Sequence, residues 1–213
     1  MHLRKHRAFT LLELLVVMSI IGIIAAIVVP ASTSMMMSSR LTDASAQVVA
    51  QLTRARQIAI AHNRTVEVRF YQFGDGEIPG ESAANPSTGK YRALQVFEYA
   101  DSGSAIPSTK IERLPDGVIF DSGATLSTLF SPTQKKTFSS ALDTAVSLPR
   151  GVGTNYTCSA FRISPSGSAK LSLANWFVTV HRASDGDALA TPPHNYSTIQ
   201  IDAASGAVKV YRP

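Results

Sequence analysis

The chain has 213 residues, a formal net charge of +5 and a mean hydropathy of +0.08. With 45% hydrophobic and only 16% charged residues, it is neither a disordered chain nor a protein with several membrane spans. Its single cysteine, Cys158, excludes an intramolecular disulfide and a cysteine-based zinc cage.

A long apolar segment near the N-terminus predicts a transmembrane helix over residues 9–29. The run from Leu14 to Val29 holds no charged residue, and its extension back to Phe9 adds only the charge of Glu13. About 20 helical residues are roughly 30 Å long, enough to cross a bilayer core. A basic leader without acids precedes the run and contains Arg4, Lys5 and Arg7. Basic residues beside a first span stay in the cytoplasm, so we expect the rest of the chain to lie across the membrane.

Two ordinary export signals compete as interpretations of this segment: a cleaved secretory signal and an uncleaved signal anchor. A cleaved secretory signal would use the small-residue site at Val29-Pro30-Ala31 and leave Ser32 at the N-terminus. A plain signal anchor would keep Met1. Neither explains Glu13, because a carboxylate at the centre of an apolar span costs about 2.5–3.5 kcal/mol. Glu13 could also lie near the lipid headgroups at little cost.

The segment from Arg7 to Val17, with sequence RAFTLLELLVV, resembles the class III signal of type IV pilins and type II secretion pseudopilins. The resemblance implies that a prepilin peptidase cuts between Ala8 and Phe9 and methylates the new N-terminus at Phe9. Ala8 stands where the family usually has glycine. In such filaments, the carboxylate at the position of Glu13 pairs with the N-terminal amine of a neighbouring subunit. Pro30 matches a proline that many pilins carry, and we expect a helix kink there.

An amphipathic extension of the helix is predicted over residues 30–62. Apolar residues recur at helical spacing, and the helix should end near His62. The predicted buried stripe comprises Leu41, Ala44, Val48, Leu52, Ala55 and Ala59. Arg54 and Arg56 are expected to be solvated.

Residues 63–213 predict a β-rich head on the far side of the membrane. Alternating segments indicate strands, the first of them half-buried, and Ser122–Thr154 is expected to be a long excursion with little regular structure. The predicted strands are 65–73, 91–99, 118–120, 160–164, 168–173, 176–181, 197–202 and 207–211. Together with the helix, they predict an α+β, pilin-like fold in which the helix packs on an antiparallel sheet.

Within this superfamily, the nearest resemblance is to the H-type (GspH/FimT-like) minor pseudopilins and, more narrowly, to the D member of the Verru_Chthon cassette proteins. It is carried by the helix end from Arg54 to Ile60, by the strand from Val66 to Tyr71, by Tyr91–Gln95 and by the turn from Ile163 to Gly167. The resemblance implies a minor subunit of a type II secretion pseudopilus or a type IV pilus-like filament. Its partners would be the prepilin peptidase, other pilin subunits, an inner-membrane assembly platform and membrane lipid. The chain would be a single-pass protein of the inner membrane with a cytoplasmic N-terminus.

No pattern in the chain predicts catalytic, metal or cofactor chemistry, so we expect a protein that is not an enzyme. The histidines share no ligand spacing, and Asp185-Gly186-Asp187 is interpreted as a turn rather than one arm of a calcium loop. Cys158 is expected to be a buried or semi-buried single thiol. The alternatives are a DNA-uptake minor pilin and an exported β-domain binding protein. Nucleic acid is disfavoured because the tail offers only Lys209 and Arg212, with Arg182 upstream, and three of the five net charges lie in the leader.

Overall fold

The computed structural model describes the chain except residues 1–9, 87–88, 137, 139–142, 144 and 173–175, and except the side chains of residues 27–34. It divides into two compact units, residues 1–39 and 40–213. The helix α1, Leu11–His62, contributes to both units and ends where the sequence predicts. It runs through Pro30 without a break, and the kink expected there stays a prediction.

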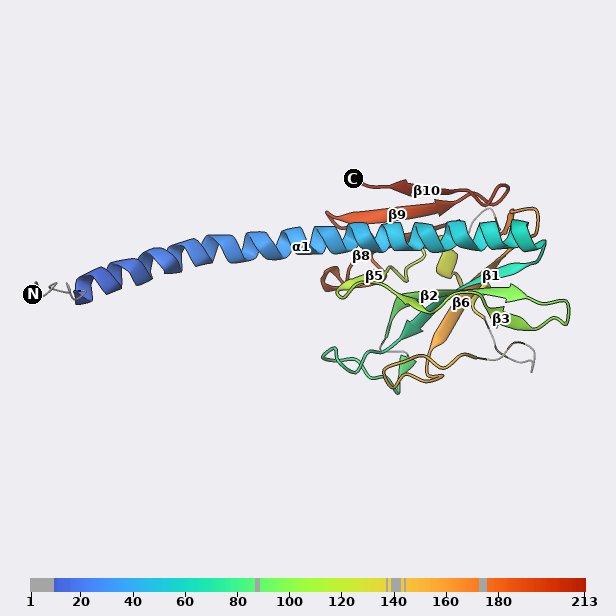
Figure 1. The fold of residues 1–213 in the computed structure, drawn as a ribbon, viewed down its shortest axis with the longest axis horizontal. Helices are drawn as coiled ribbons and strands as arrows, with labels where there is room; N and C mark the ends of the chain where they lie inside the picture. Colours follow the sequence, from blue (N-terminus) through green and yellow to red (C-terminus); the bar gives the residue numbers. More distant parts are fainter. Residues whose placement is uncertain (1–9, 87–88, 137, 139–142, 144, 173–175) are drawn as a thin grey trace, which may run out of the picture. The chain divides into compact units, whose positions relative to one another are not determined.

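The second unit contains a ten-stranded, fully antiparallel sheet (Figure 1). Eight strands follow the order β10-β9-β8-β5-β2-β1-β6-β7, and β3 and β4 pair with β2. The strands are β1 Val66–Phe73, β2 Lys90–Tyr99, β3 Ala105–Pro107, β4 Glu112–Arg113, β5 Val118–Phe120, β6 Thr157–Ile163, β7 Ala169–Lys170, β8 Phe177–Arg182, β9 Tyr196–Ile201 and β10 Val208–Tyr211. The predicted α+β architecture, a helix packed on an antiparallel sheet, is confirmed.

The main hydrophobic core lies between α1 and one face of this sheet. Every residue of the predicted helical stripe is buried there. The strands contribute the alternate positions Val66, Val68 and Phe70 of β1 and their partners on neighbouring strands. Rows of small residues on a helix let a sheet approach closely, and Ala44, Ala55 and others of the stripe have this role.

The opposite face of the sheet is also covered over β1, β2 and β6, which corrects the expectation of a half-buried first strand. Glu67 and Arg69 of β1 point away from α1, yet they are only 2% and 0% exposed. The excursion over 122–154 supplies the cover, with Leu148 and Val152 in a second apolar cluster. Its described residues form only the short 3₁₀ helices η2 Thr128–Phe130 and η3 Pro132–Gln134 with isolated bridges, which confirms its irregular character.

Two turns meet at the C-terminal end of α1. The predicted hairpin after β6 is present, although β7 is shorter than expected. Gly206 has φ +65°, and a Cβ atom there would lie 2.1 Å from the carbonyl oxygen of Gly167. Arg56 is not simply solvated, because its Nε donates a hydrogen bond of 2.8 Å to the carbonyl of Ser205. The helix end is therefore fastened to the β9–β10 turn.

Candidate assembly site and the charged groups of the head

The predicted processing site lies outside the described residues. The leader 1–8 and both residues of the scissile bond, Ala8 and Phe9, belong to the undescribed N-terminus. The structure therefore does not test cleavage or N-methylation, and both stay predictions.

Glu13 forms a capping box at the start of α1. The Oε2 atom of Glu13 accepts hydrogen bonds from the backbone N–H of Thr10, at 3.0 Å, and from the Thr10 hydroxyl, at 2.9 Å. In return, the backbone N–H of Glu13 donates to Oγ1 of Thr10 at 3.2 Å. This reciprocal arrangement satisfies N–H groups that a helix start leaves unpaired. The spacing Thr-x-x-Glu before an apolar run is its sequence signal, and our sequence reasoning missed it.

The capping box leaves half of the Glu13 carboxylate unused. Both hydrogen bonds from Thr10 end on Oε2, and Oε1 has no partner among the described residues. A carboxylate oxygen can accept more than one hydrogen bond, so Glu13 can hold its own helix and still receive a second donor.

The first half of α1 exposes a continuous aliphatic surface. Eleven large apolar side chains between Leu11 and Ile24 are 46% to 82% exposed. The hydroxyl of Ser19 is satisfied within the helix, because it donates to the carbonyl of Leu15 at 2.8 Å. Such a surface requires an apolar partner.

Among the described residues, no helix combines the length and the apolar character that crossing a membrane requires.

The same segment matches a known family model. Residues 3–29 match the prokaryotic N-terminal methylation motif, which spans the basic leader, the predicted cleavage site and the apolar run. The match confirms the resemblance of this segment to the signal of the type IV pilin and pseudopilin superfamily. The chain is thus a protein that carries a prepilin-type N-terminal signal, joined to an α+β head.

Two solved structures are partly similar to the chain. One is the minor pseudopilin EpsH from the Type 2 Secretion System of Vibrio cholerae, with 9% identity, a TM-score of 0.43, and coverage of 82% of this chain and 98% of that one. The other is the type IV minor pilin FimU of Pseudomonas aeruginosa, with 14% identity, a TM-score of 0.41, and coverage of 82% and 93%. Both TM-scores are below 0.5, so these likenesses are too loose to assign a fold or a function. No curated protein sequence matches the chain.

A network of buried charges joins the head's sheet to the long excursion. Glu67 lies at its centre and pairs with Arg69 and Lys136, each at 2.7 Å, and with Arg162 at 3.0 Å. The Tyr99 hydroxyl donates to Glu67 at 2.9 Å. Burial raises the pKa of Glu67, but hydrogen bonds and charges from Lys136 and Arg69 outweigh it and hold the pKa low.

Asp143 completes this network from the excursion. Its carboxylate contacts both Arg69 and Lys136. The Arg69 guanidinium also stacks on Phe97, with Cζ 3.7 Å from the ring centroid. Buried ions of opposite sign are costly to separate. The network therefore fixes the excursion over the sheet, and its carboxylates are occupied by these internal contacts.

A second buried ion pair lies between β8 and the residue that follows β5. His181 and Asp121 are both fully buried, and His181 Nε2 is 3.0 Å from Asp121 Oδ2. His181 Nδ1 lies 2.8 Å from the carbonyl oxygen of Arg182. Both partners are hydrogen-bond acceptors, and the hydrogen bonds to Asp121 and Arg182 raise the pKa of His181 against the effect of burial, which favours the protonated imidazolium. Buried and fully bonded, it has no free nitrogen for acid–base chemistry.

The remaining sequence-predicted residues are dispersed. Cys158 is buried, as expected, and burial raises its pKa to about 12. Asp187 pairs with Lys90 at 3.3 Å and accepts the backbone N–H of Ser122 at 2.8 Å, which ties two loops together. Asp185 lies in the 3₁₀ helix η4, Ala183–Asp185. In the described part of the chain, the structure brings no three His, Cys, Asp or Glu side chains together as a metal site.

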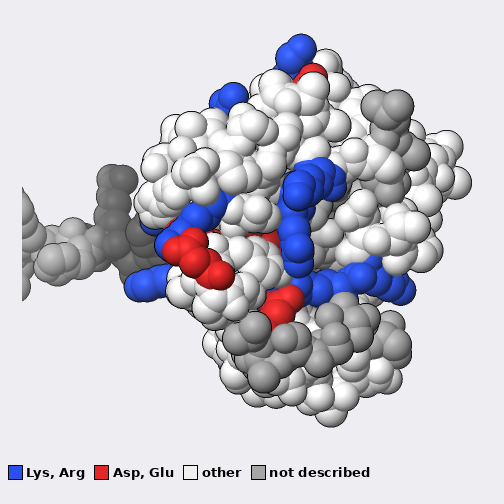
Figure 2. All heavy atoms as spheres, turned by 90° about the vertical axis from the view of Figure 1, so that its right-hand side faces the viewer, with Lys and Arg blue, Asp and Glu red and all other residues white. Residues whose placement is uncertain are grey.

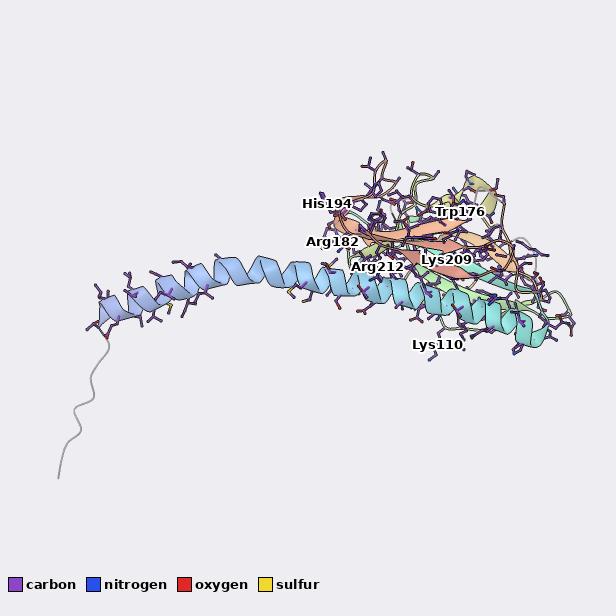
Figure 3. All side chains as sticks on the ribbon, turned by 90° about the horizontal axis from the view of Figure 1, so that it is seen from above. Lys110, Trp176, Arg182, His194, Lys209 and Arg212 are labelled. Atoms are coloured by element: carbon purple, nitrogen blue, oxygen red, sulfur yellow. The ribbon has the colours of Figure 1, made fainter. Side chains whose placement is uncertain are left out.

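Basic residues of the head lie in several places. Four of them, Lys135, Lys136, Arg162 and Lys170, line one hollow together with Glu67. Figure 3 shows Lys209 and Arg212 on the same side of α1 as Trp176, whereas Lys110 lies on the other side. In the same view, Arg182 and His194 lie at one end of the head. Figure 2 shows Asp and Glu side chains interspersed with Lys and Arg on one face. In that hollow Glu67 already pairs with Lys136 and Arg162, which leaves a phosphate backbone few unpaired cations at any one place.

Proposed function

We propose that the chain is a minor pilin-like structural subunit that a prepilin peptidase cuts between Ala8 and Phe9 and that then joins a filament. The observation that carries the proposal is the methylation motif over residues 3–29, which coincides with an exposed aliphatic helix surface and a carboxylate at its start. The filament is a type II secretion pseudopilus or a type IV pilus-like fibre. Before assembly the subunit resides in the cytoplasmic membrane, with its N-terminus in the cytoplasm and its head outside.

In this proposal, Glu13 is the assembly contact. Cleavage creates a positively charged amine on Phe9, and the amine of a neighbouring subunit would meet the unused Oε1 of Glu13. Opposite charges attract strongly where water is excluded, and either charge alone is costly to bury. The aliphatic surface of α1 would be covered by lipid before assembly and by neighbouring helices afterwards.

The N-terminus of the mature protein tests the processing step. We expect mass spectrometry of the membrane-extracted protein to find methylated Phe9. Ala8→Gly should retain cleavage, and Ala8→Glu should block it, because the peptidase accepts a small residue at this position in the family that the signal resembles. Recovery of wild-type protein that begins at Ser32, or that retains Met1, would instead support an ordinary export signal.

A pair of substitutions separates the assembly role of Glu13 from its capping role. Glu13→Gln keeps a hydrogen-bond acceptor for Thr10 but removes the charge, since glutamine also serves in a capping box. Thr10→Val removes the hydroxyl, and with it two of the three capping hydrogen bonds, and keeps the charge of Glu13. We expect Glu13→Gln to be cleaved normally and to enter sheared filaments at least about tenfold less than wild type, consistent with losing one buried charge pair. Thr10→Val should enter at near wild-type level. Equal incorporation of Glu13→Gln and wild type would refute the assembly role.

DNA uptake is a weaker alternative for the same protein. The pairing of Lys136 and Arg162 with Glu67 and the spread of the other basic residues disfavour it. A gel-shift of the detergent-solubilised full chain at low salt tests it. Retardation of DNA at micromolar protein would favour this alternative over a purely structural role.

A further inference from the structure

A hollow lined by aromatic side chains lies on the outer face of β8, β9 and β10. Its volume is about 480 Å³, within the range of small-ligand sites. The lining includes Trp176, Phe177, Tyr196 and Tyr211, together with Gln200 and Arg212. Strand register explains the grouping, because Phe177 lies opposite Gln200 and Tyr211 lies opposite Thr198 on the face turned away from the core.

These aromatic residues are unusual within the head because they are accessible. Most other aromatic side chains of the described head, such as Phe70 and Phe120, are buried in the core. In the hollow, Tyr211 is 51% exposed, and Trp176, Phe177 and Tyr196 are partly exposed. Trp176 and Phe177 pack edge to face, with ring centroids 5.1 Å apart, which limits the movement of the indole.

Polar groups with unused hydrogen-bonding capacity accompany the rings. Among the described residues, the side chains of Tyr196, Gln200 and Tyr211 and the indole N–H of Trp176 have no hydrogen-bond partner. The lining contains no carboxylate. The one cation of the lining, Arg212, already donates to the hydroxyl of Thr42 at 3.2 Å, and Lys209 borders the hollow opposite Gln200. The hollow therefore offers flat apolar faces and neutral donors and acceptors, with one lysine at its edge.

We propose that this hollow binds a neutral carbohydrate chain. A pyranose ring presents a face of C–H groups that packs on an aromatic ring and an equatorial rim of hydroxyls that seek donors and acceptors. The hollow supplies both kinds of group at once, and several aromatic rings can contact successive sugars. A single-stranded nucleic acid would also stack on the rings, but its phosphates require several cations, and the hollow provides only the engaged Arg212 and, at its edge, Lys209. The proposal does not depend on cleavage or filament assembly.

Trp176 gives a direct measurement because it is the only tryptophan of the chain. The full chain is solubilised in a detergent without a sugar headgroup, so that the detergent does not compete. Cellohexaose, chitohexaose and maltohexaose are titrated while the emission of Trp176 is recorded, with an oligo-dT strand as the polyanionic probe. We expect at least one hexasaccharide to change the emission saturably and oligo-dT to have no effect at physiological salt.

Two variants locate the binding. Tyr211→Ala and Gln200→Ala alter accessible side chains of the hollow and should weaken binding of that hexasaccharide, by about tenfold for the loss of the tyrosine ring. Ile106→Ala on β3 is the matched control, because Ile106 is 52% exposed and outside the hollow, and it should bind like wild type.

Three results would overturn the proposal. One is the absence of any emission change with the three sugars at millimolar concentration. Another is equal binding by Tyr211→Ala and Ile106→Ala. The third is Tyr211-dependent binding of oligo-dT without binding of any sugar, which would assign the hollow to nucleic acid.

Discussion

Replacement of Asp121 by Asn removes the charge of the fully buried Asp121–His181 pair while it preserves the volume of the side chain. In the wild type, Asp121 Oδ2 accepts from His181 Nε2 and from the backbone N–H of Leu189, at 3.0 and 3.1 Å. Oδ1 accepts the backbone N–H of Gly123 at 2.8 Å. An asparagine amide nitrogen cannot accept, so either orientation places it against at least one of these donors.

The expected loss of stability is large because both members of the pair are inaccessible to solvent. Removal of one partner from a buried ion pair costs about 3–5 kcal/mol. Domains of this size have unfolding free energies of about 5–15 kcal/mol. Asp121→Asn should therefore leave the head folded but with a much lower urea midpoint.

The sign of the pH dependence distinguishes this pair from a simple packing contact. Burial by itself lowers the pKa of His181, but the hydrogen bonds to Asp121 and Arg182 and the charge of Asp121 outweigh it, so the pKa is raised. Stability from this histidine is complete below its unfolded pKa of about 6.5 and is lost as the pH rises through the higher folded pKa. The pKa of Asp121 is lowered, although burial alone would raise it, because His181 and two backbone N–H groups donate to it. Its contribution is lost as the pH falls below about 4.

In Asp121→Asn, the histidine is buried without an anion. Burial then lowers its pKa, so this group should destabilise the variant as the pH falls below about 6.5, the reverse of wild type. Urea unfolding of the full chain between about pH 5 and 9, followed by far-UV circular dichroism, measures both slopes. Equal slopes, or a wild-type midpoint that does not fall at alkaline pH, would refute the reasoning.

Two further substitutions test the contacts of α1 and of the β9–β10 turn. Leu52→Ala removes a side chain that is 1% exposed in the core and should cost about 2–5 kcal/mol, measured from the urea midpoint; a loss below 1 kcal/mol would show that α1 packs loosely. Gly206→Ala places a Cβ atom in a left-handed conformation against the Gly167 carbonyl and should cost about 1 kcal/mol or more, with faster amide exchange in β10. Gly76→Ala, where a Cβ atom meets open space, is its control and should change neither measurement.

The local patterns of the chain predict its regular elements well. The stripe from Leu41 to Ala59 has the period of a helix, and a helix of that period can bury only one face, so its burial followed directly. The longer strands alternate with period two and were expected close to their observed bounds. The short strands β3 and β4 were not expected, because two or three residues carry no readable period and owe their pairing to β2.

The burial of the polar face of β1 could not be predicted from the sequence, because it depends on contacts between residues far apart in the chain. The polar residues Glu67 and Arg69 alternate with apolar ones, as in a strand with one solvent-exposed face. In the structure, Asp143 and Lys136 of the excursion cover and neutralise them. Nothing local indicates this, since the partners are about 70 residues apart and the excursion has no periodicity. By contrast, the capping box of Thr10 and Glu13 is a local pattern with a physical meaning, and it could have been found.

The two units differ in how completely their charged and apolar groups find partners within the chain. The head pairs its buried ions internally, at Glu67 and at His181. It also buries one apolar cluster between α1 and the sheet and a second between the sheet and the excursion. The first half of α1 does neither, because its aliphatic side chains are exposed and Oε1 of Glu13 has no partner among the described residues. Association gains free energy by burying apolar surface that was exposed and by pairing polar groups that had no partner before binding. Under the proposed function, assembly therefore depends on α1, while the surface of the head, including the aromatic hollow, is left free for a ligand.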